Sequence, residues 1–563
     1  MPGMSIIEQP TPSKVHPVKR AAIGAVRSLE RFSPETLVML GLFVGLLVGV
    51  AILLRPWFTP GIGPDSSASV LYFDRLTAGQ PLEAFVGVTP KPGITLLYGL
   101  EFNAFHDWRT IAAGAAIEFA VMLTAAAALA WRTKGPVAAG MTAVGLLGTK
   151  LILLDAALTY ANPWAILFWL LAGLALTARS PRYGLAGAFL FVAALMRIET
   201  FIIIAAGAAA LAAWRFAPVK WVPGSSRPPA RAILLLVGVA ALPVMVVHDW
   251  LLTGNGFFWL DVSSILSKAA PASVESPLQL AQDLVAHYIP AWPLALLAVA
   301  GVADMVRRRR VVVLLGLLAC GPGVLAFLEL LAFKNTYVSN RYTIPADAAL
   351  VFAAAVGAEV LVLAVARRVG RLRQLAPTAT QIAAGGRARD RLTVAGGAVV
   401  IGAIVAVACI HPYGPLDHET WTAIDKYRAL QGNYESVKPT IVAALAALPD
   451  KPVWSVADVE KVHGGPTPRL YAPGLLWPRL AVDLGLPVWE VRDGSPVLGD
   501  AANLRVTIRS IVYLDTRQGT DPVGDDTPLE VSAPTRVGFV LVTPLVARPA
   551  DGLWVLELDP LTD

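Results

Sequence analysis

The sequence predicts a polytopic α-helical membrane protein of about 11 transmembrane helices, followed by a soluble α/β domain at the C-terminal end. Of the 563 residues, 56% are hydrophobic and only 15% are charged, which is too apolar for a soluble globular protein. Apolar runs of about 20 residues recur along the chain, and each is long enough to cross a bilayer as a helix. After about residue 412 these runs give way to segments punctuated by Pro, Asp and Gly.

Eleven membrane spans are expected, and any count from ten to thirteen fits the same hydropathy. They lie near residues 36–55, 111–131, 136–156, 163–178, 183–198, 200–215, 232–252, 290–306, 311–332, 343–366 and 393–411. The basic tail before the first span, residues 1–35, is longer than the n-region of a signal peptide, and no convincing cleavage site follows it. We therefore expect a retained anchor and a transmembrane domain over residues 36–411.

The orientation is predicted from the loops in which Lys and Arg collect. The N-terminal tail is basic, and so are alternate short loops, including Arg132 with Lys134, residues 307–310 and residues 367–391. Because basic residues near span ends resist translocation, the N-terminus is expected in the cytoplasm. The loop 56–110 and the domain 412–563 are then extracytoplasmic, as in an enzyme of the plasma (inner) membrane.

The net charge of +6 follows from this topology. No basic stripe interleaved with aromatic residues is present, so nucleic acid is rejected as a partner. The region 412–563 contains a helical run, Val437–Leu448, and two strand-like runs, Leu504–Leu514 and Arg536–Val542, which predict a soluble α/β domain. Four tryptophans of this region could stack on sugar rings, but a place in the core is the preferred interpretation: Trp454, Trp477, Trp489 and Trp554.

The first outer loop is expected to carry the chemistry. Asp65 follows a Gly-Pro turn and precedes a helical run, so it is predicted to be an N-cap whose ionised carboxylate lies at the positive end of a helix. Asp74 lies nine residues further on and turns to the opposite helix face, whereas Tyr72, at seven residues, returns to the face of Asp65. The two aspartates are therefore not expected to form a pair.

Further charges gather on the predicted outer side. An ionisable group at mid-bilayer costs roughly 2.5 to 3.5 kcal/mol, so charges within spans indicate a cavity or a partner. Arg197 and Glu199 lie at the junction of the fifth and sixth spans, where a structural ion pair and a functional role are equally good interpretations. His248 and Asp249, near the end of the seventh span, could act as a metal-binding or base pair, but hydrogen-bonded structure is the preferred interpretation. A cationic pocket around one carboxylate is expected.

The loop motifs resemble those of the GT-C superfamily of glycosyltransferases. In the first loop, Asp65 soon after a span, Gly79-Gln-Pro and Lys91-Pro92 before an apolar helix resemble the family's first outer loop. Three later segments resemble, in order, its Arg-Pro-Glu junction, its loop ending in Gly-Asn and its Arg-Tyr-x-x-Pro segment: Leu195-Met-Arg197-Ile-Glu199, His248-Asp249-Trp-Leu-Leu-Thr-Gly254-Asn255 and Asn340-Arg341-Tyr342-Thr-Ile-Pro345. The four motifs cover roughly residues 36–366.

The resemblance implies a transferase that moves a sugar from a polyprenyl-phosphate donor to a glycan, lipid or protein acceptor on the outer face of the membrane. Asp65 corresponds to the catalytic acidic residue. The expected substrate-binding residues are Lys91, Arg341, Tyr342, Arg197, Glu199, His248, Asp249 and Tyr72. The chain departs from the pattern at Gly93 and Ile198, where many relatives have Pro. It also lacks an Asp-x-Asp in the first loop, so no metal cofactor is expected to be required, although a divalent ion remains an option.

The chemistry of sugar transfer fits these residue types. A sugar hydroxyl is a poor nucleophile, so a carboxylate such as Asp65 must accept its proton as the new bond forms. A phosphate leaves without being protonated, so one carboxylate is enough. Inversion at the anomeric carbon is expected from direct displacement of the phosphate. The leaving phosphate must be met by cations, which Lys91, Arg341 and Arg197 would supply. An apolar groove between spans would hold the polyprenyl chain.

Two other classes of function remain open. A transporter or flippase would also need a charged cavity between spans, but inverted repeats of the transporter kind are not visible in the sequence. A membrane protein of polymer assembly, whose C-terminal region binds cell-wall glycan, is the third class. The large domain at one end favours an enzyme that acts there.

Overall fold

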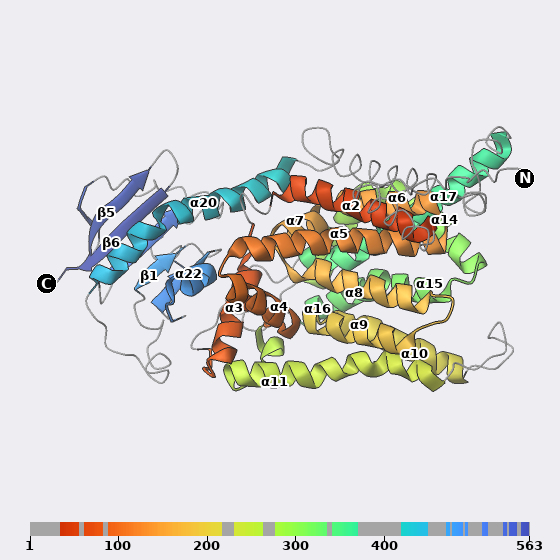
Figure 1. Cartoon of the computed structure of the whole chain (residues 1–563), viewed down its shortest axis with the longest axis horizontal. Helices are drawn as coiled ribbons and strands as arrows, with labels where there is room; N and C mark the ends of the chain where they lie inside the picture. The colour runs from red at the N-terminus through yellow and green to blue at the C-terminus, as the bar shows by residue number, and fades with distance from the viewer. Residues whose placement is uncertain are drawn as a thin grey trace, which may run out of the picture.

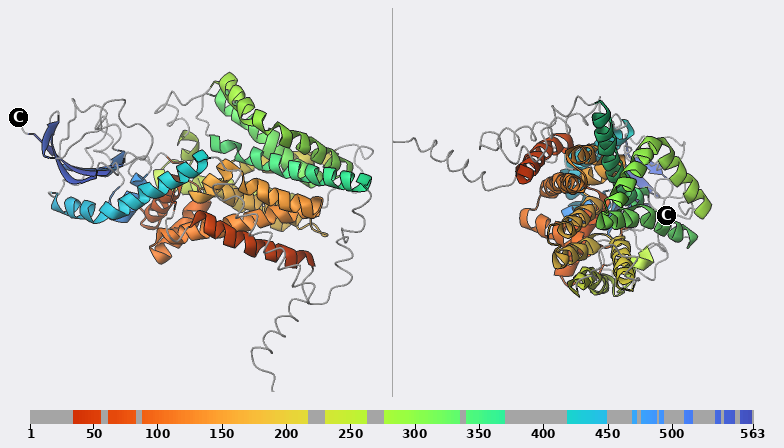
Figure 2. Two further views of the ribbon diagram at one scale, coloured as in Figure 1. Left: turned by 90° about the horizontal axis from the view of Figure 1, so that it is seen from above. Right: turned by 90° about the vertical axis from the view of Figure 1, so that its right-hand side faces the viewer.

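The computed structural model describes most of the helical part and the principal elements of the C-terminal part. The described residues are 34–55, 61–82, 88–216, 230–262, 276–334, 340–369, 418–448, 469–472, 476–487, 490–493, 509–515, 533–537, 540–548 and 553–561. Figure 1 shows an elongated molecule, with a bundle of long helices at one end and a β-sheet at the other. In the end-on view of Figure 2 the helices gather into one bundle.

The bundle consists of helices that are apolar along most of their length. They are α2 (Pro34–Leu54), α5 (Trp108–Thr133), α6 (Pro136–Leu147), α7 (Lys150–Ala157), α8 (Ala161–Leu176), α9 (Tyr183–Met196), α10 (Thr200–Phe216), η2 (Ala230–Ala240), α11 (Ala241–Thr253), α13 (Pro277–Tyr288), η4 (Ile289–Ala291), α14 (Trp292–Arg307), α15 (Val311–Leu318), η5 (Ala319–Gly323), α16 (Val324–Phe333), η6 (Asn340–Thr343) and α17 (Ile344–Val369). A central core of α2, α5 and α6 side chains includes Leu46, Phe119 and Leu147, all fully buried. Side chains at helical spacing on one face explain this packing.

Six helical segments of the described chain are long and apolar enough to cross a membrane, and a seventh results if α6 and α7, bent by 65°, form one span. The helices α8, α9 and α10 are apolar but shorter. The first ten predicted spans all fall on helical segments, and the third of them is divided between α6 and α7. The eleventh, residues 393–411, lies outside the described residues, and the count of eleven stays a prediction.

Two further helices lie at the end of the bundle that faces the sheet. They are α3 (Pro64–Thr77) and α4 (Pro92–Phe105), both within the loop predicted over residues 56–110. Each begins with proline at its first position. Proline suits this position because an N–H there would have no partner within the helix, and because the fixed φ of proline is close to that of a helix. Figure 1 shows both between the long helices and the C-terminal elements. We refer to this region as the α3/α4 end of the bundle.

The C-terminal part contains the α/β structure predicted for it. A long helix, α20 (His418–Ala447), and a short one, α22 (Trp477–Leu484), accompany six strands: β1 (Leu470–Ala472), β2 (Val491–Asp493), β3 (Ser510–Asp515), β4 (Thr535–Val537), β5 (Val540–Arg548) and β6 (Leu553–Pro560). The sheet order is β2-β1-β3-β6-β5-β4; β1 pairs in parallel with β2 and β3, and the other pairs are antiparallel.

Two expectations about this part are refined by the structure. The run Arg536–Val542, predicted as one strand, is divided between β4 and β5, which pair antiparallel with each other. The apolar residues Val537, Val540, Leu541 and Val542 follow closely in the sequence, so the pattern did not separate the two strands. Trp554 on β6 is 5% exposed, which confirms a core position. The side chain of Trp477, and Trp454 and Trp489 altogether, lie outside what the structure describes.

The C-terminal part packs directly on the α3/α4 end of the bundle. Val482 of α22 lies against an apolar cluster that includes Ile62, Val70 and Trp108. The indole Nε1 of Trp108 donates a hydrogen bond to Asp483, at 2.8 Å. Figure 1 shows α20 running from the end of α2 to the sheet, and the left view of Figure 2 shows the sheet beyond that end. The two parts therefore share an interface beside the predicted catalytic loop.

Candidate active site

Asp65 lies in the first turn of α3, but it does not cap the helix. The N-cap is Gly63, whose carbonyl oxygen accepts the amides of Ser66 and Ser67, and Pro64 occupies the first helical position. The predicted N-cap role of Asp65 is therefore wrong by two residues, because the Gly-Pro pair begins the helix itself. The carboxylate of Asp65 is left available for contacts outside its own helix.

Two cations hold this carboxylate. Lys91 Nζ donates a hydrogen bond to Asp65 Oδ2 at 3.0 Å, and Arg341 Nη1 lies 3.7 Å from the same oxygen. The Asp65 and Lys91 side chains are only 16% and 13% exposed, so solvent screens their attraction weakly. The structure thus brings together three of the predicted site residues from positions 65, 91 and 341.

The charges decide the ionisation of Asp65. Burial disfavours the charged carboxylate, but Lys91 and Arg341 outweigh burial and lower the pKa of Asp65 from 3.8 to about 2. Burial lowers the pKa of Lys91 from its ordinary value, against the opposing effect of Asp65. At neutral pH the Asp65 carboxylate is therefore ionised, as the sequence predicted, and its strongest partner is Lys91.

Lys91 is held in place at the start of α4. It is the N-cap residue of that helix, and Pro92 follows it. A β-carbon on the next residue, Gly93, would lie 2.7 Å from Met196 Sδ at the end of α9. The close approach of α4 to α9 at residue 93 thus favours a residue without a β-carbon.

Arg341 is positioned by an aromatic ring that the sequence analysis missed. Its guanidinium lies over the ring of Tyr160, 4.1 Å from the ring centre, in a cation–π contact. Tyr160 stands in the turn between α7 and α8, immediately after Thr159, which adopts a positive φ of 59°. A tyrosine in a polar break between two apolar helices was the available signal.

The same turn anchors the N-terminus of α3. Gly63 N donates to Leu158 O at 2.9 Å, and Ser66 Oγ donates to Thr159 O at 2.7 Å. Tyr98 of α4 also donates its hydroxyl to Thr159 O, at 2.8 Å. Ser66 was not singled out in the sequence, yet it connects the helix of Asp65 to the turn that carries the ring beneath Arg341.

Arg197 and Glu199 form a buried ion pair beside these residues. Arg197 Nε donates to Glu199 Oε2 at 3.0 Å, and Arg197 Nη2 makes a second contact with Glu199 Oε1. The guanidinium also lies 5.3 Å from the ring centre of Tyr342. The ion pair accords with the structural interpretation of Glu199, and a substrate-binding role stays a prediction. The Arg197 charge adds to those that lower the pKa of Asp65.

His248 and Asp249 contact each other at the end of α11. His248 Nδ1 and Asp249 Oδ1 are 3.0 Å apart, and Asp249 Oδ2 accepts the backbone N–H of Trp259 at 2.8 Å. This bond to the backbone supports the preferred interpretation of hydrogen-bonded structure. In the described part of the chain His248 Nε2 is buried without a hydrogen-bond partner.

Tyr72 is fully buried, and its hydroxyl donates to Val88 O at 2.6 Å. Burial and the nearby carboxylate charge of Asp65 raise the pKa of Tyr72 well above its ordinary value. The hydroxyl is therefore a neutral donor engaged with the backbone, which argues for support of α3 and against contact with substrate.

Asp74 accepts a hydrogen bond from Asn103 at 2.9 Å, and the expectation that it does not pair with Asp65 is confirmed.

A second carboxylate near the site was assigned no catalytic role in the sequence. Asp155 of α7 is fully buried and accepts a hydrogen bond from Asn162 Nδ2 at 2.5 Å. It lies within electrostatic reach of Arg341 and Asp65. Its other oxygen has no hydrogen-bond partner among the described residues. Asp155 therefore belongs to the charge cluster around Arg341.

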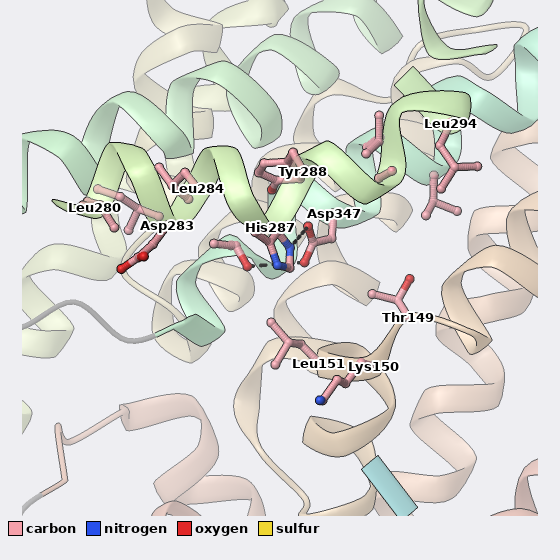
Figure 3. A pocket seen from close by; sticks show the side chains of 15 residues that line it. Thr149, Lys150, Leu151, Leu280, Asp283, Leu284, His287, Tyr288, Leu294 and Asp347 are labelled. Atoms are coloured by element: carbon pink, nitrogen blue, oxygen red, sulfur yellow. Dashed lines mark hydrogen bonds and ion pairs between the residues drawn. The ribbon is translucent and has the colours of Figure 1, made fainter. Parts of the chain in front are cut away.

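A cavity of about 570 Å³ opens between α7, α13, α16 and α17. Leu280, Leu284 and Leu294 form part of its apolar wall, and Figure 3 shows them across the cavity from Thr149 and Lys150 of α7. His287 Nε2 lies 3.1 Å from Asp347 Oδ1 in the same wall. Thr343, also in the wall, follows Arg341 by two residues, so the cavity begins near the charge cluster. We call it the bundle cavity.

A second cavity, of about 520 Å³, lies between the bundle and the C-terminal part. Its walls are the turn that begins α5, with Trp108 and Arg109, and the helices α20 and α22. Most of its lining side chains are charged. The described residues contain no group of three or more His, Cys, Asp or Glu arranged to hold a metal ion. The expectation that no metal is required stays a prediction.

Comparisons with known proteins give structural likeness only. No protein-family model and no curated protein matches the sequence. Among solved structures, ArnT from Cupriavidus metallidurans in the apo state is similar, with 14% identity and a TM-score of 0.42, over 96% of this chain and 98% of that one. The oligosaccharyltransferase of Archaeoglobus fulgidus tethered with an acceptor peptide is similar with 12% identity and a TM-score of 0.45, over 85% of this chain and 69% of that one.

The same archaeal oligosaccharyltransferase, AglB, in complex with an inhibitory peptide and a dolichol-phosphate, gives 12% identity and a TM-score of 0.43, over 85% of this chain and 69% of that one. Because every TM-score is below 0.5, the case for a function rests on the geometry around Asp65.

Proposed function

We propose that the protein is an inverting membrane glycosyltransferase. It transfers a sugar from a polyprenyl-phosphate donor to a cell-envelope glycan, lipid or protein acceptor. The reaction takes place on the outer face of the plasma membrane, at the α3/α4 end of the bundle, with the N-terminus in the cytoplasm. Asp65 is the proposed general base, and Lys91 and Arg341 are the proposed phosphate-binding residues.

The observation that carries the proposal is the shared carboxylate of Asp65. It is largely buried, ionised at neutral pH, and held at 3.0 Å by Lys91 and at 3.7 Å by Arg341. A site with two cations around one carboxylate matches a reaction in which a phosphate leaves while a hydroxyl loses its proton. The proposed function uses both charge signs of this cluster.

A carboxylate with a pKa of about 2 is a weak base, and the proposed mechanism accounts for this. When the donor phosphate binds, Lys91 and Arg341 exchange the Asp65 carboxylate for phosphate oxygens. Asp65 then loses the partners that lower its pKa, and its basicity rises toward that of an ordinary carboxylate. The acceptor hydroxyl gives its proton to Asp65 as its oxygen bonds to the anomeric carbon. The bond from that carbon to the phosphate breaks, and the lipid phosphate departs against the cations.

The bundle cavity is the proposed place for the first part of the polyprenyl chain. Its leucines offer apolar area without directional contacts, which suits an isoprenoid chain. Its wall includes Thr343, two residues from Arg341, so a phosphate bound by Arg341 would leave the chain near the cavity entrance. The proposed reaction needs no metal ion, because side-chain cations meet the phosphate.

The test is transfer by the purified protein in nanodiscs. Labelled polyprenyl-phosphate sugars, including mannose and arabinofuranose donors, are offered with cell-envelope extracts as acceptors, with and without EDTA. We expect transfer by the wild type and by Asp74→Asn, a control on the same helix whose partner is Asn103. Asp65→Asn should reduce turnover at least a thousandfold. Substantial transfer by Asp65→Asn would reject the base assignment, and facilitated movement of donor without transfer would favour a flippase.

A further inference from the structure

The segment that leads into the helix of Asp65 is contacted from two sides by residues far away in the sequence. On one side, Gly63 N donates to Leu158 O at 2.9 Å, in the turn between α7 and α8. On the other side, Gln431 Nε2 of α20 donates to Ile62 O at 2.7 Å. Ile62 is 2% exposed, and Asp65 follows it by three residues. The C-terminal part thus contacts the backbone of the catalytic segment directly.

Gln431 is itself fixed by Arg479 of α22. Arg479 Nη1 donates to Gln431 Oε1 at 3.1 Å, and both side chains are 3% exposed. Since the arginine is a donor and the Ile62 carbonyl is an acceptor, only one orientation of the Gln431 amide satisfies both neighbours. The Gln431 amide is held at both its nitrogen and its oxygen, so its orientation is already fixed before substrate binds. A fixed orientation suits a residue that positions another group.

Arg479 is in turn held by groups from both parts of the molecule. Its Nη2 contacts Glu435 Oε1, and its Nε lies 3.5 Å from Asp483 Oδ2. Its guanidinium also lies 5.6 Å from the ring centre of Trp108, at the start of α5. Asp483 accepts the indole N–H of Trp108 at 2.8 Å. The contacts from α5 through α22 and α20 to Ile62 therefore form one continuous polar network, in which Gln431 and Arg479 are buried and Glu435 is half exposed.

We infer that Gln431 is a positioning residue for Asp65 and that the C-terminal part completes the active site through it. The inference rests on the proposed function, because it assigns Gln431 a task in placing the general base. Gln431 touches neither reacting atoms nor the proposed donor site. Its contribution is to fix the carbonyl of Ile62, and with it the start of α3, relative to Lys91 and Arg341.

The test separates the two hydrogen bonds of the amide. Gln431→Glu keeps an acceptor for Arg479 but replaces the donor to Ile62 O with a second oxygen, which repels that carbonyl. Gln431→Leu removes both bonds at similar volume. The control is Val442→Ala, on the same helix with a side chain that is 48% exposed. Each protein is examined at full length in nanodiscs, with its thermal midpoint recorded.

The first readout does not depend on any activity. We expect the amides of Ser66 and Ser67, which bond to Gly63 O, to exchange hydrogen for deuterium at least fivefold faster in Gln431→Glu than in the wild type. In Val442→Ala the rates should be unchanged. Equal rates in Gln431→Glu and the wild type would overturn the inference whether or not the protein is a glycosyltransferase.

The second readout is catalytic. In Gln431→Glu the kcat for sugar transfer should fall about tenfold or more, while the Kd for polyprenyl phosphate does not rise. Loss of the Lys91 contact should also raise the pKa of Asp65 in the free enzyme, so that kcat/KM declines at a higher pH on the acid side than in the wild type. An unchanged kcat and acid limb, in a preparation where Asp65→Asn is inactive, would overturn the positioning role and leave the proposed function intact. If the wild type transfers no sugar but Gln431→Glu exchanges its amides faster, the proposed function is rejected and the link from Gln431 to the start of α3 stands.

Discussion

Replacement of Asp65 by asparagine should strengthen the binding of polyprenyl phosphate while it abolishes transfer. In the free protein the carboxylate occupies the cations that the proposed mechanism reserves for the donor phosphate. The donor must therefore compete with Asp65 and must also approach its negative charge. An amide at residue 65 can still accept a hydrogen bond from Lys91, so the local geometry should survive while the competition disappears.

The size of this competition follows from the ionisation of Asp65. Its pKa falls from 3.8 to about 2. At about 1.4 kcal/mol per pKa unit, this fall corresponds to a net stabilisation of the charged carboxylate of about 2 to 3 kcal/mol. If a bound phosphate displaced all of that net interaction, its removal would tighten binding by roughly sixtyfold. The expected gain is smaller, because the asparagine amide keeps a weaker contact with Lys91.

The assay is isothermal titration calorimetry, in which a short-chain polyprenyl phosphate is added to the protein in nanodiscs at pH 7. We expect the Kd of Asp65→Asn to be about 5- to 30-fold lower than that of the wild type. Asp74→Asn should bind like the wild type, because Asp74 pairs with Asn103 away from the cations. Equal or weaker binding by Asp65→Asn would refute the idea that donor and carboxylate share Lys91 and Arg341.

Three other predictions follow from the same contacts. Lys91→Met should weaken polyprenyl phosphate binding by roughly 10- to 100-fold, since a charge-assisted hydrogen bond contributes about 1.5 to 3 kcal/mol; unchanged calorimetric affinity would remove Lys91 from the site. Tyr160→Leu should lower kcat/KM about two- to fivefold through loss of the cation–π contact with Arg341, and wild-type kinetics would show that the ring is dispensable. Finally, because the pKa of Asp65 is lowered on folding, its stabilisation of about 2 to 3 kcal/mol is present above about pH 5 and is lost as the pH falls from about 4 to 2. The thermal midpoint of Asp65→Asn should therefore fall less between pH 5 and pH 2 than that of the wild type, and equal falls would contradict this.

The sequence predicted the membrane helices well because hydropathy is a local property. Each of the first ten predicted spans coincides with helix, and the helix that follows Asp65 is present. Periodicity also separated Asp65 from Asp74 correctly, since both lie on the same helix. The N-cap assignment failed because Gly63 and Pro64 together begin the helix earlier than a rule based on capping side chains indicates.

Contacts between distant segments could not be derived in this way. Residue types on the predicted outer side indicated a shared pocket for Asp65, Lys91 and Arg341, but not that one carboxylate oxygen faces both cations. The ring of Tyr160 beneath Arg341 had no motif, because its role depends on a turn whose Thr159 adopts positive φ. Tertiary packing, which no periodicity records, places these groups.

The C-terminal part is the clearest case of this limit, because composition marks it as a separate soluble domain. Such a boundary suggests an accessory module that could be removed without harm to the site. The buried hydrogen bonds from Arg479 to Gln431 and from Gln431 to Ile62 argue against removal. Without α20, Ile62 O would lose its donor and would bond to water instead. The segment before Asp65 would then relax toward solvent, away from the geometry in which Asp65 faces Lys91 and Arg341.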